Sequence, residues 1–457
     1  MTRLHHISSS HVGRKLTIAF ISTLLLLLAG LNHTSASPDI VTFEYEFDRS
    51  KLPNLNSTEL TVLISVGDAT GIQIRDERRA PVSYTHLRRS QKIMVTSEAQ
   101  TLIVELAGVT DFNQLGDISK ANLKDNKLWA WSHSFDDNHF LEEAIDIMQK
   151  HDLPATMYVV GDWIDSGYPW EGDLTALELH QLMDAGWSIG NHTLDHDNNC
   201  GVQPSLTERR QSILQTEITL KEVIQTSNRP NYKVISFAVP CGGADRFNDY
   251  HQIVKKLRDE GKTDLLFSEG GHETPLHIDA SPHFDFDIQI KRDLAIDGEE
   301  DNTAEIKAIF DSASLNARTK SAGVFWYNSF SHGTRTFGNN AYKLNAVAEY
   351  FVATYGKNGS DEAWMAPADE IYSYLLVRDL TTITTAVTSP PIEPTPAETP
   401  QPSSTPTATP NSSLPTVEPT ATLDFMVTST PIPPAGGDTV SKLHLPYLVK
   451  QVSRSSD

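Results

Sequence analysis

Strand-like and helix-like segments alternate from about Leu128 to Leu380, and this alternation constrains the fold of the 457-residue chain more than any other feature. Short apolar runs such as LWAWSHSF, ATMYVVG and AGVFWYNSF are each followed by a segment with amphipathic helical spacing. One helix is expected to begin at SLTE, a capping box with Ser205 as N-cap and Glu208 three residues later. Repeated strand–helix units predict a parallel sheet, either open or closed into a barrel.

A different pattern precedes this region. Between about Pro38 and Lys120, runs such as VTFEYEF, ELTVLISVG and TLIVELAG alternate apolar and polar residues and are separated by turn-forming residues. Such alternation is typical of half-buried antiparallel strands. We therefore predict a small β-sandwich-like domain over residues 38–125 and an αβ domain over residues 126–380. The first of these contains no cluster of histidines or acids, so we expect it to have an accessory role.

The N-terminus has the order of a secretory signal peptide. Basic residues up to Lys15 precede an apolar run and then the small residues of HTSAS. We predict a signal peptide over residues 1–36. An uncleaved anchor is the alternative, although the run is short for a membrane span.

The C-terminal part of the sequence differs from both domains. Residues 381–439 are dominated by Pro, Thr and Ser, a composition that cannot bury enough apolar surface to fold, and we predict a disordered linker. A short tail over residues 440–457 follows. It is either a docking segment for attachment to a cell surface or a frayed end.

Charge and cysteine content narrow the function further. The net charge of −22 argues against nucleic-acid binding, which requires a basic surface. The chain has two cysteines, Cys200 and Cys241. Export would place them in an oxidising compartment, where one disulfide can persist, and two buried thiols are the alternative.

Candidate functional residues follow the strands of the αβ region, where such folds gather their functional groups. Asp136 and Asp137 end the first strand, and HTLDH carries His192 and His196 after the third. Histidines four apart on a helical turn share a face and can bind one ion. One of two adjacent carboxylates can bind a metal while its neighbour accepts a proton, although acids at a helix N-terminus are a structural alternative. His332 follows a late strand, either as a general acid or as a loop histidine.

In combination these motifs are more specific. SFDD, HTLDH, a Pro-Gly turn and FSHG, in this order in one strand–helix domain, resemble the polysaccharide deacetylase family, the NodB-homology enzymes of carbohydrate esterase family 4. The resemblance covers roughly Leu128 to Leu380. It implies an α/β fold, an irregular (β/α) barrel with an active-site groove at the strand C-termini. The small all-β sandwich-like domain precedes this barrel, and the disordered Pro/Thr-rich tail follows it.

The resemblance also implies a role for each motif residue. Asp136 corresponds to the general base, and Asp137 to a metal ligand. His192 and His196 complete the metal site, for which zinc is the expected ion, and His332 corresponds to the general acid.

Further residues correspond to the substrate-binding part of the family's site. Phe330 corresponds to the apolar residue that lines the acetyl pocket. Pro240, Cys241 and Gly242 correspond to the family's Pro-x-Gly turn, in which the residue after proline offers a backbone N–H to the oxyanion.

The third motif departs from the family pattern. Ala238 stands where the family has an arginine that braces the catalytic aspartate, so a cation that keeps the base ionised is missing. Arg246 is our candidate replacement. The family's Asp-x-x-Asp-Trp motif is not recognisable, and QIKR, with Arg292, resembles the strand that follows it.

The resemblance also implies a structural role for the two cysteines. In the family fold, the loops that contain Cys200 and Cys241 both flank the metal. We therefore predict a disulfide between them that braces the site, with two inert thiols as the alternative.

These expectations lead to a functional hypothesis. The chain is expected to be a secreted, metal-dependent hydrolase that removes N-acetyl groups from a polysaccharide or amino-sugar polymer, outside the cell or at its surface. Removal of O-acetyl groups would use the same residues. The alternative from another class is a carbohydrate-binding surface protein that keeps the fold but has lost efficient catalysis.

Overall fold

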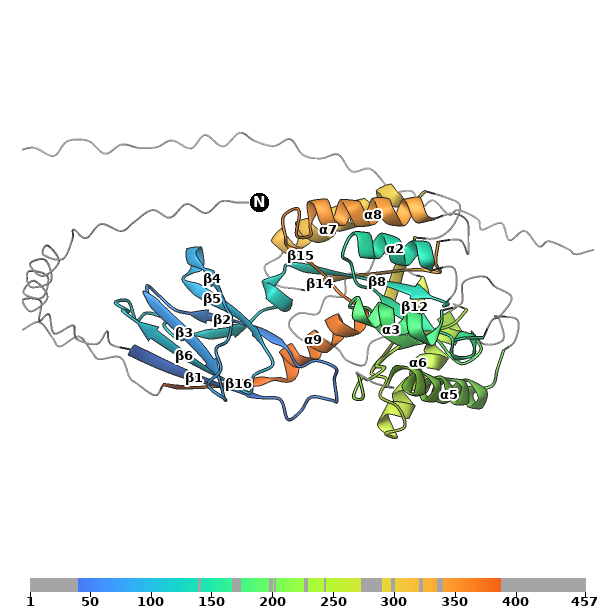
Figure 1. Ribbon diagram of the computed structural model, residues 1–457, viewed down its shortest axis with the longest axis horizontal. Coiled ribbons are helices and arrows are strands. Elements are labelled where there is room, and N and C mark those ends of the chain that lie inside the picture. Colours follow the sequence, from blue (N-terminus) through green and yellow to red (C-terminus); the bar gives the residue numbers. More distant parts are fainter. Residues whose placement is uncertain are drawn as a thin grey trace, which may run out of the picture. The chain divides into compact units, whose positions relative to one another are not determined.

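A computed structural model describes most of the two predicted domains (Figure 1). The described residues are 40–138, 141–166, 174–196, 200, 203–225, 229–241, 244–272, 290–296, 301–319, 324–334 and 340–387. They all belong to one compact unit, Met1–Glu393. The predicted signal peptide, the tail over residues 440–457 and most of the predicted linker lie outside the described residues.

Parallel strands in the αβ domain form a closed and irregular barrel. The strands pair in sequence order, and the last of them, β14, pairs with the first, β8. A further short strand, β15 (Ala363–Met365), pairs with the first half of β8, whereas β9 pairs with the second half. The predicted parallel sheet is therefore closed rather than open. The barrel strands are β8 (Trp129–Asp136), β9 (Thr156–Val159), β10 (Ser188–Asn191), β11 (Ser236–Ala238), β12 (Phe267–His272), β13 (Ile290–Ala295) and β14 (Phe325–Ser331).

Helices follow most of these strands, as the alternation predicts. The capping box predicted at Ser205 and Glu208 is present, and a second one, formed by Thr175 and Glu178, begins α3. The side chain of each N-cap accepts a backbone N–H of the first helical turn and so fixes where the helix begins. The helices are α2 (Glu142–Lys150), α3 (Ala176–Asp184), α5 (Leu206–Ile224), α6 (Ala244–Asp259), α7 (Thr303–Thr319), α8 (Ala341–Thr354) and α9 (Ala368–Leu380).

Strand β8 shows how the sequence positions the site. All of its residues are buried, and they alternate between two faces. On one face, Trp129 and Trp131 pack on Phe310 of α7 and Phe351 of α8. The other face carries small residues and ends at Asp136. Large rings outside and small residues inside therefore leave room for a polar group at the C-terminal end of the strand.

The N-terminal domain is a sandwich of two antiparallel sheets. One sheet has the order β16–β1–β6–β3, and the other has the order β4–β5–β2–β7. Alternate residues of β1 and β6 are buried, which matches the period-two pattern of the sequence. The strands are β1 (Ile40–Asp48), β2 (Leu60–Ser65), β3 (Gly71–Asp76), β4 (Thr85–Leu87), β5 (Lys92–Ser97), β6 (Thr101–Ala107), β7 (Ile118–Lys120) and β16 (Thr382–Val387).

Strand β16 differs from the sequence-based expectation. We predicted a disordered linker from residue 381, but Thr382–Val387 pairs antiparallel with β1 along its whole length. The segment is rich in β-branched residues, and the edge of β1 supplies the backbone partners that its composition alone does not suggest. The chain thus returns to the sandwich after the barrel.

The sandwich and the barrel share one apolar cluster. Val62 and Val104 of the sandwich belong to the same cluster as Ala130, Trp326 and Ile371 of the αβ domain. Ala130 and Trp326 lie near the start of their strands, so the sandwich covers the N-terminal end of the barrel. The opposite end, where the candidate residues lie, is left to the loops. Among the residues described, no helix is long and apolar enough to cross a membrane.

Candidate active site

Both carboxylates of the Asp136–Asp137 pair point into one site. In a regular strand, neighbouring side chains point to opposite faces. Asp137 instead leaves the strand with φ of 60°, in the left-handed region that few non-glycine residues adopt. As a result, one carboxylate oxygen of Asp136 lies 4.0 Å from His192 Nε2, and one of Asp137 lies 3.6 Å from the same nitrogen.

The two predicted histidines converge on Asp137. His192 Nε2 and His196 Nε2 lie 3.6 and 3.3 Å from Asp137 Oδ1, and the imidazole centroids are 5.0 Å apart. They do not share a regular helical turn as expected. His196 instead has φ of 52°, and its ring faces Asp137.

His192 is held in the form that a metal ligand needs. Its Nδ1–H donates a hydrogen bond of 2.9 Å to the carbonyl oxygen of Ala238, so Nε2 keeps its lone pair. Burial lowers the pKa of His192 to about 4, although the nearby carboxylates of Asp136 and Asp137 oppose this effect. The ring is therefore neutral at neutral pH.

This donor set fits a divalent ion. The ligand atoms of Asp137, His192 and His196 all lie within 4.8 Å of one another. Asp137 Oδ1 is buried and has no hydrogen-bond partner, although the Nε2 lone pair of His192 faces it. A lone pair that faces a carboxylate oxygen is repulsive unless a cation lies between them, and two imidazoles with one carboxylate are a ligand set that zinc accepts.

Asp136 has an arginine partner that the sequence analysis did not assign to it. The Arg292 guanidinium, from β13, forms a close ion pair with Asp136 Oδ1. The two side chains are only 5% and 2% exposed. The guanidinium lies over the ring of Phe330, 4.4 Å from its centroid, and 5.9 Å from the centroid of Tyr158. Our candidate Arg246 is also buried, but it is Arg292 that contacts the aspartate.

This partner sets the charge of Asp136. Burial alone would raise the pKa of the carboxyl, but Arg292, followed by His192, lowers it well below its usual range. The Asp136 carboxylate is therefore ionised throughout the neutral range. Because Arg292 holds Oδ1, it is Oδ2 that faces His192.

The predicted acid and the predicted apolar residue lie beside each other at the end of β14. Phe330 is buried, His332 is half-buried, and their rings meet edge to face at 5.4 Å. The charge of His332 is among those that lower the pKa of Asp136. The structure thus brings His332 to the same end of the barrel as the acidic pair.

The predicted disulfide is present between Cys200 and Cys241, whose Cα atoms are 5.4 Å apart. It joins the loop after β10 to the turn after β11. The two sulfur atoms lie 3.8 and 3.7 Å from His196 Nδ1, so the disulfide packs on the side of the ring that faces away from Asp137. Pro240 is buried beside it, and Gly242 lies outside the described residues.

Comparison with known proteins identifies the segment that carries most of this site. Residues 125–260 match the family model of polysaccharide deacetylases. The matched segment contains the acidic pair, both histidines and Cys241, whereas Arg292 and His332 lie beyond it. No curated protein matches the chain.

Solved structures show similarity at low sequence identity. The peptidoglycan deacetylase PdaC from Bacillus subtilis is 16% identical, with 55% of this chain and 92% of that chain covered and a TM-score of 0.31. A family 4 acetyl xylan esterase from Clostridium thermocellum, in complex with a cobalt ion, is 14% identical, with coverage of 53% and 90% and a TM-score of 0.31. These values are too low to transfer an activity or a substrate.

Metal binding tests the donor set directly. His192→Ala and Asp137→Asn should each weaken binding of Zn²⁺ at least 100-fold, because each removes one of three ligands. Asp136→Asn should keep bound metal, since its Oδ1 is held by Arg292. Isothermal titration of chelator-treated protein measures this. Equal affinity in all four proteins would exclude the site.

The disulfide makes a separate prediction about stability. It closes a loop of 41 residues by sequence separation. Replacing both cysteines by alanine should lower the free energy of unfolding by about 2–5 kcal/mol, because the unfolded chain is no longer constrained. Denaturant unfolding measures the change, and wild-type protein under reducing conditions should unfold at the same midpoint as the double variant. An unchanged midpoint, or two titratable thiols in denatured, unreduced protein, would contradict the bond.

Proposed function

We propose that the chain, whose residues 125–260 match the family model of polysaccharide deacetylases, is a secreted, metal-dependent carbohydrate deacetylase that hydrolyses N-acetyl groups on an amino-sugar polymer. One observation carries the proposal. The ionised and buried carboxylate of Asp136 lies beside Asp137, His192 and His196, the three residues that could bind a metal ion. This pairing places a base next to an electrophilic centre, which amide hydrolysis requires.

The donor set would hold the metal through Asp137, His192 and His196, with zinc as the expected ion. The ion would supply positive charge that polarises an acetyl carbonyl and makes a water molecule more acidic.

Asp136 acts as the general base. Its Oδ2 faces the site and takes a proton from the attacking water as the water oxygen bonds to the acetyl carbon. Arg292 fixes the other oxygen, so the carboxylate cannot rotate away. The low pKa makes Asp136 a weak base in the ground state, and it keeps the reactive ionised form populated at neutral pH.

Two further groups complete the reaction. The backbone N–H of Cys241 donates to the oxyanion that forms when water adds to the carbonyl. His332 gives a proton to the nitrogen as the carbon–nitrogen bond breaks, which leaves acetate and a free amine. Phe330 lines the space for the acetyl methyl group, and its contact with His332 positions the acid.

The contact between Arg292 and Asp136 supports an enzyme over the binding-protein alternative. That alternative was supported by the unrecognisable Asp-x-x-Asp-Trp motif and by Ala238, which stands where the family motif has its arginine. Arg292 supplies the same positive charge to the same carboxylate from another strand. The base therefore keeps the partner that an active deacetylase needs.

Other features of the chain support the proposed location. The predicted signal peptide, the disulfide and the net charge of −22 support secretion. An amino-sugar polymer is our choice of substrate, with O-acetylated polysaccharide as the second candidate.

Acetate release tests the function. Purified full-length protein with Zn²⁺ should release acetate from oligomers of N-acetylglucosamine, and a chelator should abolish the release. Asp136→Asn should lower kcat by at least about 100-fold while metal stays bound, because general base catalysis is lost. Asp146→Asn, which changes an exposed carboxylate on α2, is the matched control and should leave kcat unchanged.

The outcomes separate the alternatives. Release from acetylated xylan alone would favour the O-acetyl substrate. Binding of oligomers without any acetate release, with and without Zn²⁺, would favour the binding protein and contradict the proposed reaction.

A further inference from the structure

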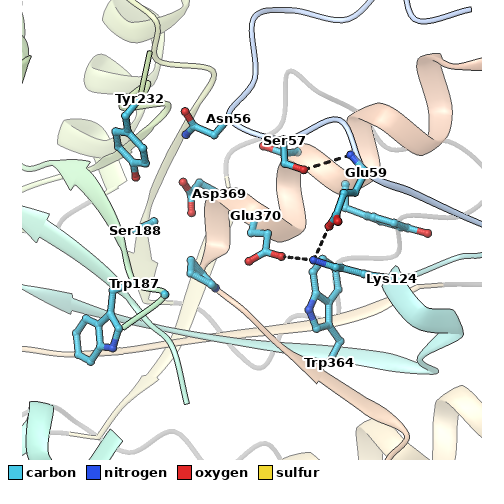
Figure 2. Close-up of a pocket in the computed structure, with 14 residues that line it drawn as sticks. Asn56, Ser57, Glu59, Lys124, Trp187, Ser188, Tyr232, Trp364, Asp369 and Glu370 are labelled. Atoms are coloured by element: carbon cyan, nitrogen blue, oxygen red, sulfur yellow. Dashed lines mark hydrogen bonds and ion pairs between the residues drawn. The ribbon is translucent and has the colours of Figure 1, made fainter. Parts of the chain in front are cut away.

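A second pocket lies at the other end of the barrel from the candidate active site (Figure 2). Its volume is about 200 Å³. Ser188, at the start of β10, lines it, whereas the catalytic residues follow the ends of the strands. The first turn of α9, Trp364 of β15 and the loop between β1 and β2 form its other walls. None of these residues takes part in the proposed reaction.

The pocket holds an unneutralised carboxylate. Asp369 is 5% exposed, and its Oδ1 is buried with no hydrogen-bond partner. The cation in the described lining is Lys124, and it is already engaged by Glu59 at 2.7 Å and by Glu370 at 2.9 Å. Figure 2 shows these two ion pairs on one side of the pocket and Asp369 apart from them. The lining therefore carries an excess of negative charge, centred on Asp369.

A buried carboxylate that no cation neutralises is costly, and the fold offsets this cost only in part, through the Ser188 hydroxyl and the backbone N–H groups of Glu370 and Asp369. Burial raises the pKa of Asp369 to about 6, and Glu370 adds to the effect, while the Ser188 hydroxyl opposes it. The carboxyl is still mainly ionised at neutral pH. A cationic group bound against it would remove the penalty, because a paired buried charge is far cheaper than an unpaired one.

The rest of the lining suits a sugar ring. Trp364 is half-buried and lines the pocket with Tyr374, whose ring it meets edge to face at 5.5 Å, and Tyr232 lines another part of the pocket. Aromatic faces pack on the apolar face of a pyranose, as they do on other apolar surfaces. The Tyr232 hydroxyl accepts the N–H of Ile189 at 3.1 Å, so its own proton is available to a ligand hydroxyl.

We propose that this pocket binds a sugar ring that carries a protonated primary amine, with the ammonium group against Asp369 and the ring against Trp364. The negative charge of the lining and the volume of the pocket favour a ligand in which a cation is attached to a ring of about the size of a sugar. The choice of an amino sugar among such cations rests on the proposed function, since that reaction exposes amines on the polymer. The chain would then hold deacetylated polymer at the end of the barrel opposite to the reaction.

Binding of defined oligosaccharides to full-length protein tests this site. All proteins carry Asp136→Asn, so that no substrate is turned over during the titration. The probes are the tetramer of glucosamine, the tetramer of N-acetylglucosamine and the neutral tetramer of glucose, titrated calorimetrically at pH 7. Asp369→Asn should weaken binding of the glucosamine tetramer at least tenfold and leave that of the other two unchanged.

Two further variants test charge and the ring contact separately, and the unfolding temperature of Asp369→Asn controls for folding. Glu370→Gln removes the same charge one residue along α9, from a carboxylate that Lys124 neutralises, and should weaken binding less than threefold. Trp364→Ala keeps every charge and should weaken binding at least fivefold. Asp369→Asn should also unfold at a temperature no lower than its parent protein, because an unpaired charge has been removed.

Several results would overturn the proposal. Equal losses in Asp369→Asn and Glu370→Gln would show an effect of net charge without a site. Equal binding of the glucose and glucosamine tetramers would exclude the ammonium contact, and a lower unfolding temperature in Asp369→Asn would assign the carboxylate to the fold. Failure of acetate release in the wild-type protein, with amine binding at Asp369 intact, would contradict the proposed function alone.

Discussion

The buried ion pair between Asp136 and Arg292 is the interaction on which the candidate site depends. The two residues are 156 positions apart in the sequence, and neither side chain is more than 5% exposed. An isolated carboxylate at that depth would take up a proton or lose its orientation. The guanidinium prevents both effects and leaves one oxygen free to face the metal ligands. Phe330 lies against the same guanidinium, so the ion pair also contacts the residue that we propose to line the acetyl pocket.

Barrel closure makes this ion pair available. Arg292 lies on β13 and Asp136 on β8, and β14 lies between them and pairs with both. An open sheet would leave β13 and β8 near opposite edges, with the site incomplete. The sandwich acts at the other end, where its apolar cluster is continuous with that of the barrel strands. The sandwich therefore packs on the closed barrel at the end opposite to the candidate residues, and α9 contributes to both the shared cluster and the second pocket.

Local sequence patterns predicted the elements well, and long-range contacts were harder to predict. The strand–helix alternation and the capping box at Ser205 follow from short-range spacing, whereas the convergence of Asp137, His192 and His196 was expected from their places at strand ends and from the family resemblance. Strand β16 was missed because its pairing with β1, more than 300 residues away, decides its conformation. Arg292 was missed as the partner of Asp136 because only the closed barrel brings β13 close to β8. The family motif has its arginine at one fixed place in the sequence, whereas the Asp136 carboxylate requires only a positive charge nearby, from any strand.

The pH dependence of kcat/KM in Arg292→Met tests the role of this ion pair most directly. The wild-type carboxylate stays ionised because its pKa is held low, and loss of the guanidinium should raise that pKa by about 1–3 units. Activity on the acid side should then fall at a correspondingly higher pH, and Arg292→Lys, which keeps a cation, should lie between the two. An acid limb at the same pH in all three proteins, with equal rates at pH 7, would contradict the role assigned to Arg292.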